Sequence, residues 1–334
     1  MVQRLPSEWF ETLDLPLIAA PMFLVSSIDL VAAACENGVV GAIPTVNARE
    51  PDILDGWLDT LTRRLARPPP GGRRAAPWAL SLIVHTTNKR LPADLALCVK
   101  YKAPLVLTAL GSPKTTVAAV HDYGGKVYAD VSTPEYAQKA LQANVDGLIL
   151  LCAGAGGHTG QIAAPAFVAA VREFWDGPIV LAGAMSHGND LRAAQLMGAD
   201  LSYMGTRFIA SHESAADERY KQMVIDCSFK DLLLTNAITG GWANKLKPSL
   251  VAVGLDPDNL QVKPREKFDL EYAKDQPKAW KDIWSAGHGV GQVKARESTA
   301  EIIATLRHEY AEAVANELAD PWVSRFDQSR AAAE

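Results

Sequence analysis

The stretch "PIVLAGAMSHGNDLRAAQLMGADLSYMGT" at residues 178–206 contains the pattern that decides the fold. An apolar run at 178–184 is followed by an amphipathic segment at 188–197 and then by a second apolar run at 201–206. Continuously apolar runs of this length are typical of strands buried on both faces of a parallel sheet. "MGAD" at 197–200 places a glycine where a helix is expected to end. The stretch therefore predicts one strand–helix–strand unit.

The same unit recurs along the first part of the chain. Apolar runs predict eight strands, at 16–21, 39–44, 78–84, 104–110, 126–131, 147–153, 178–184 and 201–206. Amphipathic stretches predict helices between them, at 28–37, 51–66, 92–102, 113–123, 133–143, 164–175 and 188–197. Right-handed crossovers would join eight such units into an α/β fold of the (β/α)8 TIM barrel type. An open Rossmann-type sheet is the alternative, but no GxGxxG follows an early strand.

The pattern changes after the eighth strand. Residues 207–227 are expected to form a helix, and residues 228–297 are irregular and rich in glycine, which predicts a small insertion or cap over the barrel mouth. Ser298 and Glu301 form a capping box for an amphipathic helix at 298–318. The predicted division is a barrel at 1–227, an insertion at 228–297 and a C-terminal helix that completes the barrel at 298–334.

Composition excludes several classes of protein. With 48% hydrophobic and 21% charged residues, the 334-residue chain can bury a large core. A net charge of -5 gives no electrostatic footprint for nucleic acid or an anionic membrane. No run approaches the ~18 apolar residues of a membrane-spanning helix, and the first residues are too polar for a signal peptide. Four widely spaced cysteines in apolar settings predict reduced thiols in a cytoplasmic protein, and no spacing predicts a metal site.

Small residues follow the last two strands of the predicted barrel. Barrel active sites lie where the strands end, and the loops after strands seven and eight often bind phosphate. Gly183 and Ala184 end strand seven, and Gly205 and Thr206 end strand eight. Backbone amides and a nearby helix N-terminus could bind the phosphate of a cofactor there. Tight packing between strand and loop is the alternative explanation for these residues.

One histidine stands out because it lies among glycines. His158 is part of "GAGGHTG" at 154–160, directly after the sixth strand. Histidine is the side chain most easily tuned for proton transfer near neutral pH, and glycines leave room for a planar ligand. A loop histidine that only bonds to backbone is the alternative. His85 and His288 could line the same site, whereas His187 could simply begin a helix.

Taken together, these motifs resemble the nitronate monooxygenase family, formerly called 2-nitropropane dioxygenases. The resemblance spans about residues 16–290. It rests on "APM" at 20–22, "AGGHTG" at 155–160, "LAGAM" at 181–185, "MGTRF" at 204–208 and "WSAG" at 284–287. FMN-dependent enoyl-ACP reductases and NADH:quinone reductases share this frame.

The resemblance implies a barrel enzyme that binds FMN and converts nitronates or nitroalkanes with O2 into carbonyl compounds and nitrite. The alternative within the same frame is an FMN-dependent NAD(P)H reductase of an enoyl thioester or a quinone. A barrel that only binds a phosphate ligand, without catalysis, is a third hypothesis. The expected partners are a small-molecule substrate and O2, with no nucleic acid or membrane, and a homodimer is compatible with the sequence.

The resemblance also assigns roles to individual residues. It implies His158 as the base and Ser285 near the substrate. The residues that it places against the FMN are Pro21, Met22, Phe23, Ser81, Thr87, Asp130, Gly157, Gly183, Ala184, Gly205 and Thr206. The chain departs from the family pattern at three places: the usual "SGG" is "AGA" at 182–184, several relatives have Asn at Ser81, and some have Lys at Asp130. The departures at Ser81 and Asp130 would alter the contacts to the flavin.

Overall fold

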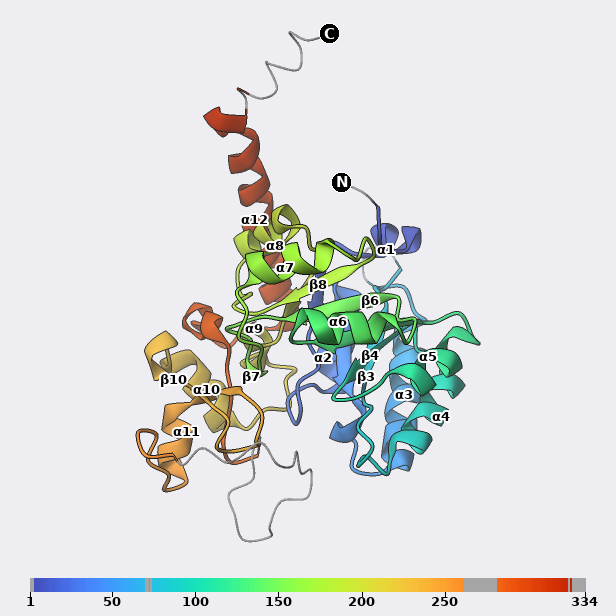
Figure 1. Cartoon of the computed structure of the whole chain (residues 1–334), viewed down its shortest axis with the longest axis horizontal. Coiled ribbons are helices and arrows are strands. Elements are labelled where there is room, and N and C mark those ends of the chain that lie inside the picture. The colour runs from blue at the N-terminus through green and yellow to red at the C-terminus, as the bar shows by residue number, and fades with distance from the viewer. Residues whose placement is uncertain (1–2, 70–71, 73, 261–280, 324, 326–334) are drawn as a thin grey trace.

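Eight parallel strands close into a barrel in the computed structural model, which describes residues 3–69, 72, 74–260, 281–323 and 325 (Figure 1). Ile18 pairs with both Val40 and Tyr203, so the first strand closes the barrel against the last. The (β/α)8 barrel is confirmed, and the open sheet is wrong. The barrel strands are β1 (Leu17–Ala19), β2 (Val40–Pro44), β3 (Trp78–Ile83), β4 (Leu105–Ala109), β5 (Lys126–Val131), β6 (Gly147–Leu151), β8 (Ile179–Ala182) and β9 (Leu201–Met204).

Helices follow the strands much as the apolar spacing predicts. α8 (Gly188–Met197) shows why: a capping box of His187 and Asp190 begins it, and Gly198 ends it with a φ of 104°. The prediction that His187 begins a helix is therefore confirmed. The other helices of the barrel are α2 (Ile28–Glu36), α3 (Pro51–Leu65), α4 (Leu91–Lys100), α5 (Lys114–His121), α6 (Pro134–Leu141) and α7 (Ala164–Arg172), and a short α1 (Ser7–Thr12) precedes β1.

The core has two layers. Side chains that point into the barrel, among them Ile18, Leu107, Tyr128 and Ile149, fill its interior. A larger layer lies between the strands and the outer helices. Full burial of a large apolar side chain contributes about 1.5–3 kcal/mol relative to exposure, so both layers hold the strand ends in fixed positions.

The predicted helix at 207–227 is wrong as a single element. The structure has α9 (Thr206–Ile209) and α10 (Glu218–Asp226), with irregular backbone between them. The intervening residues are rich in serine and acidic side chains, which bond to nearby backbone and compete with a helix. Ser214 accepts from the amide of Ala216, and Asp217 accepts from the amide of Arg219 to begin α10.

The predicted insertion contains more regular structure than expected. β10 (Leu232–Thr235), β11 (Ala243–Leu246) and β7 (Gly157–His158) form a three-stranded sheet, so the glycine loop after β6 pairs with the insertion. α11 (Lys247–Ala252) follows, and Figure 1 shows this part grouped with α10 beside the barrel. The 3₁₀ turns are η1 (Thr45–Asn47), η2 (Phe229–Asp231) and η3 (His288–Gln292). Residues 261–280 of the predicted insertion lie outside the described residues.

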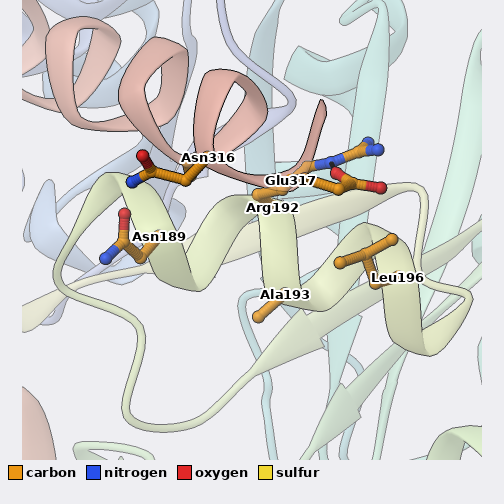
Figure 2. Close-up of a pocket in the computed structure, with 7 residues that line it drawn as sticks. Asn189, Arg192, Ala193, Leu196, Asn316 and Glu317 are labelled. Atoms are coloured by element: carbon orange, nitrogen blue, oxygen red, sulfur yellow. Dashed lines mark hydrogen bonds and ion pairs between the residues drawn. The ribbon is translucent and has the colours of Figure 1, made fainter. Parts of the chain in front are cut away.

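The last helix, α12 (Thr299–Leu318), begins at the predicted capping box of Ser298 and Glu301. Ile302, Ile303 and Leu306 pack into the core against α2 and α8, and the helix continues past the barrel (Figure 1). A groove of about 270 Å³ lies between α8 and α12 (Figure 2). It contains none of the predicted site residues.

All four cysteines are free and buried, as predicted. Burial raises the pKa of the Cys35 thiol to about 12, so this thiol is unreactive at neutral pH. Within the described part of the chain, no helix combines the length and the apolar character needed to cross a membrane.

Candidate functional site

The floor of the barrel mouth carries a buried carboxyl group. Asp130 follows Tyr128 by two residues on β5, so both side chains point into the barrel. The Oδ1 atom of Asp130 is buried and has no hydrogen-bond partner among the described residues. Burial raises the pKa of Asp130 from 3.8 to about 7. Burial, and then the charge of Asp130, raise the pKa of Tyr203, which lies against the same interior cluster.

Glycines bring several loops together at the ends of β6, β8 and β9. A Cβ at Gly287 would lie 2.7 Å from the carbonyl oxygen of Gly154 and 3.0 Å from the amide nitrogen of Gly156. The Gly287 amide donates to Thr206 Oγ1 over 2.9 Å. The segment after Ser285 is thus packed directly against the glycine loop, which only residues without side chains allow.

The turn after β8 has a strained backbone. Gly183 has a φ of 127°, and Ala184 has a φ of 59°, which costs a non-glycine residue about 1–2 kcal/mol. The N-terminus of the following α8 is already satisfied: Asp190 accepts from the amides of Ser186 and His187, and Glu309 accepts from Gly188. The first amides of α8 are therefore engaged within the protein, and the amides of the turn itself are what this side of the site offers. A phosphate site here stays a prediction.

The segment after β1 lies opposite the end of β9. A Cβ at Gly205 would lie 3.4 Å from the Sδ atom of Met22. Asn47 fixes this segment, because its amide oxygen accepts from Leu24 N and its Nδ2 donates to the carbonyl oxygen of Met22. Phe23 is 37% exposed, so its ring is accessible to a ligand. Pro21, before Met22, is half-buried.

His158 lies on β7, where Gly157 and His158 pair with Asn244 and Ala243 of β11. The predicted loop histidine is thus held in a small sheet. Its Nε2 lies 3.2 Å from Thr239 Oγ1 in the turn between β10 and β11. Burial, and then the positive charge of Lys245, lower the pKa of His158 from 6.5 to about 4. The imidazole is therefore neutral at physiological pH.

Ser285 lies next to this sheet. It forms an isolated β-bridge with Lys245 and is 5% exposed. Tyr220 donates from its hydroxyl to the Ser285 carbonyl oxygen over 2.5 Å, and its ring stacks on Trp284. Trp284 is therefore part of the apolar cluster that the insertion forms with α10.

A family model described as nitronate monooxygenase matches residues 80–309, which include the glycine loop, the ends of β8 and β9, and Ser285. The chain belongs to the nitronate monooxygenase family. It is accordingly an oxidoreductase. A nitronate monooxygenase from Paraburkholderia phytofirmans is 26% identical over 348 aligned positions, which cover 90% of this chain and 94% of that protein.

Two solved structures show the same fold as this member of the nitronate monooxygenase family. FabK from Thermotoga maritima has a TM-score of 0.74 at 22% identity and covers 95% of this chain and 98% of its own. The nitroalkane oxidase of Streptomyces ansochromogenes has a TM-score of 0.74 at 24% identity and covers 93% of this chain and 99% of its own. At these identities the likeness supports the barrel architecture and nothing finer.

The remaining predicted site residues lie on β3, in the loop that follows it and in η3. Ser81 is on β3, two residues after Ala79 of the barrel interior, so it points inward. Thr87 is exposed, and its Oγ1 bonds to Nδ1 of His85 over 2.8 Å. His288 packs against Phe229 and lines a cavity of about 420 Å³ that also includes Ala184.

Sequence reasoning missed Lys245 and Asn47. Lys245 is fully buried beside His158, and Asn47 holds the segment after β1 through three hydrogen bonds. Lys245 lies in a stretch with the polarity of a surface loop, so only strand pairing identifies it. Asn47 follows the end of β2, and this position on the functional side of the barrel is the feature of the sequence that could have identified it.

Proposed function

We propose that this protein is an FMN-dependent nitronate monooxygenase, which converts nitronates with O2 into carbonyl compounds and nitrite. The observation that carries the proposal is the position of His158: a neutral, largely buried imidazole at the barrel mouth, beside loops that are kept free of side chains. Such a group can accept a proton or a hydrogen bond next to a planar ligand.

The residues present fit FMN. The strained turn at Gly183 and Ala184 lies beside Gly205 and Thr206, and these small residues would leave room for a phosphate. The buried Oδ1 of Asp130, without a partner among the described residues, fits a polar edge of the ring. The residues proposed to contact the isoalloxazine are Pro21, Met22, Phe23, Ser81, Thr87, Asp130 and Gly157. When bound, FMN supplies the redox chemistry, and the protein supplies binding, orientation and electrostatics.

The protein's own groups would position the substrate over the ring. His158 either takes the α-proton of a neutral nitroalkane or bonds to an oxygen of the nitronate. Ser285 is buried nearby, and its Oγ has no hydrogen-bond partner among the described residues. A hydroxyl in that state can donate to a substrate oxygen.

Purified protein tests the proposal directly. An absorption spectrum should show bound flavin, an anaerobic nitronate should bleach it, and nitrite should appear when air is admitted. Anaerobic NAD(P)H that bleaches the flavin within seconds, without nitrite from nitronates, would instead favour the reductase of an enoyl thioester or quinone. A colourless protein that takes up no FMN on titration would favour the non-catalytic phosphate binder.

A further inference from the structure

Five side chains near the carboxyl ends of the barrel strands form one accessible layer. The buried interior of the barrel takes one residue from each of five strands, namely Ala79, Leu107, Tyr128, Ile149 and Leu201. The residue two positions later on each strand also points inward, because side chains alternate along a strand. Those five residues are only half-buried: Ser81, Ala109, Asp130, Leu151 and Tyr203. They are the last layer of the interior before the mouth, and we call them the floor layer.

Asp130 is the acidic member of the floor layer. Its neighbours on the adjacent strands are Ala109 of β4 and Leu151 of β6, which offer it no polar side chain. The Oδ1 atom is buried and has no hydrogen-bond partner among the described residues, whereas the side chain as a whole keeps some exposure. A buried polar atom is costly until a partner is supplied. Since the layer below is buried, the accessible side of the carboxyl group faces the mouth, and a ligand there can supply the partner.

The surroundings of Asp130 favour its neutral acid. The inward side chains of the two adjacent strands carry no charge: Leu105, Leu107, Ala109, Ile149 and Leu151. Burial raises the pKa of Asp130 from 3.8 to about 7, so the acid is its main form below about pH 7. Tyr203 is the other titratable member of the floor layer, and burial and then the charge of Asp130 raise its pKa. The small sheet beside the mouth adds His158 and Lys245, whose pKa values are lowered, first by burial, to about 4 and about 7.

We propose that Asp130 binds the isoalloxazine ring of FMN as a neutral carboxylic acid, whose hydroxyl group donates a hydrogen bond to an acceptor atom of the ring. Binding of the cofactor is then coupled to the uptake of a proton by Asp130. The inference rests on the proposed function and deepens it, since it assigns the protonation state in which this chain accepts its cofactor. Asp130 is a binding residue for the ring, and Ser81 and Tyr203 are the other polar members of the floor layer.

The chemistry of the two partners favours the acid over the carboxylate. An ionised carboxylate only accepts hydrogen bonds, whereas a protonated carboxyl group has one O–H donor. The pyrimidine part of isoalloxazine presents mostly acceptors, its carbonyl oxygens and imine nitrogens, which would repel a carboxylate. A ring over the floor layer also removes water from Asp130, and a hydrogen bond that needs the neutral form raises its pKa further. Above pH 7, each FMN that binds should therefore bring about one proton with it.

Flavin titration of the purified protein between pH 7.5 and pH 9 tests the coupling without turnover. The second pKa of a phosphate monoester is about 6, so the charge of FMN stays nearly constant over this range. The Kd of wild type for FMN should rise roughly tenfold across it, because Asp130 must regain the proton that it has lost. Riboflavin, which has no phosphate, should show the same trend. Asp226→Asn, at an exposed position of α10, is the matched control and should keep the trend. An equal Kd of wild type at both pH values overturns the proposal.

Two variants of Asp130 separate the hydrogen-bond donor from the proton. Asp130→Asn keeps a donor in its NH2 group but does not titrate, so its Kd for FMN at pH 7.5 should stay within about threefold of wild type and should not change up to pH 9. Asp130→Leu removes the donor and should bind FMN roughly tenfold more weakly than Asp130→Asn. A pH dependence that remains in Asp130→Asn would come from another group, such as Lys245, and overturns the assignment to Asp130.

Infrared difference spectra detect the proton directly. FMN-loaded wild type at pH 8 should show the C=O stretching band of a protonated carboxyl group, and Asp130→Asn should lack it. Absence of this band from wild type overturns the proposal even where FMN binds. The outcomes also separate the inference from the function on which it rests. Wild type that binds no FMN at any pH overturns the proposed function together with the inference, whereas FMN binding that is independent of pH overturns the inference alone.

Discussion

Replacement of Asp130 by asparagine should change stability relative to wild type more favourably at alkaline pH than at acidic pH. The carboxyl group is buried in the barrel mouth, where burial raises its pKa from 3.8 to about 7. A carboxyl whose pKa is raised on folding binds its proton more tightly in the folded state. Its favourable contribution is present at low pH and is lost as the pH rises through the folded pKa.

The magnitude follows from the two pKa values. A shift of about three units corresponds to about 4 kcal/mol of destabilisation above pH 7, at 1.36 kcal/mol per unit. About 2.5 kcal/mol of it develops between pH 5 and pH 8. Water that reaches the carboxylate from the mouth reduces these figures, so they are upper bounds. The asparagine amide carries no charge at either pH, so its own cost of burial cancels in the comparison.

Guanidinium unfolding at pH 5 and pH 8, on wild type and Asp130→Asn, measures this effect. The free energy of unfolding of the variant minus that of wild type should rise by up to about 2.5 kcal/mol from pH 5 to pH 8. Asp226→Asn is the control, because Asp226 is exposed on α10. A difference between wild type and Asp130→Asn that is the same at both pH values would refute the reasoning.

Three other substitutions test the loops around the site. Gly205→Asp should weaken FMN binding at least tenfold by flavin titration, because a carboxylate would face the proposed phosphate position; unchanged affinity would move the phosphate elsewhere. Gly287→Ala should lower the free energy of unfolding by about 1–3 kcal/mol, since its Cβ would lie 2.7 Å from the Gly154 carbonyl oxygen, and an unaltered melting curve would contradict that packing. Asn244→Ala should cost about 1–3 kcal/mol by leaving the carbonyl of Ala155 unpaired, and unchanged hydrogen exchange in the glycine loop would argue against this link.

The barrel could be predicted because each of its strands is recognisable from a short stretch of sequence. A parallel strand buried on both faces must be apolar throughout, so each run, such as "GLILL" at 147–151, marks a strand by itself. The capping box at Ser298 and Glu301 is equally local and was correct. The single helix predicted at 207–227 was wrong. It was predicted from the spacing of apolar residues, which does not reveal that serine and aspartate side chains bond to nearby backbone.

The small sheet could not be predicted, because its three short strands come from distant parts of the chain. β10 and β11 have four residues each, and β7 has two, which is too short for alternation to distinguish a strand from a loop. In the sequence, Lys245 therefore cannot be distinguished from an ordinary solvent-exposed lysine. Only the pairing of β11 with β7 and with Ser285 shows that this side chain is buried next to His158.

This difference between the barrel and the small sheet has a consequence for the chemistry. The proposed cofactor contacts come mostly from barrel loops, which the core holds in place. The environment of His158, by contrast, comes largely from the insertion: Thr239 bonds its ring, and burial and then the charge of Lys245 lower its pKa. Changes in the insertion can therefore alter the charge and basicity at the substrate position while the barrel loops stay the same. Substrate preference within this architecture should accordingly depend on the residues that pair with β7 rather than on the barrel itself.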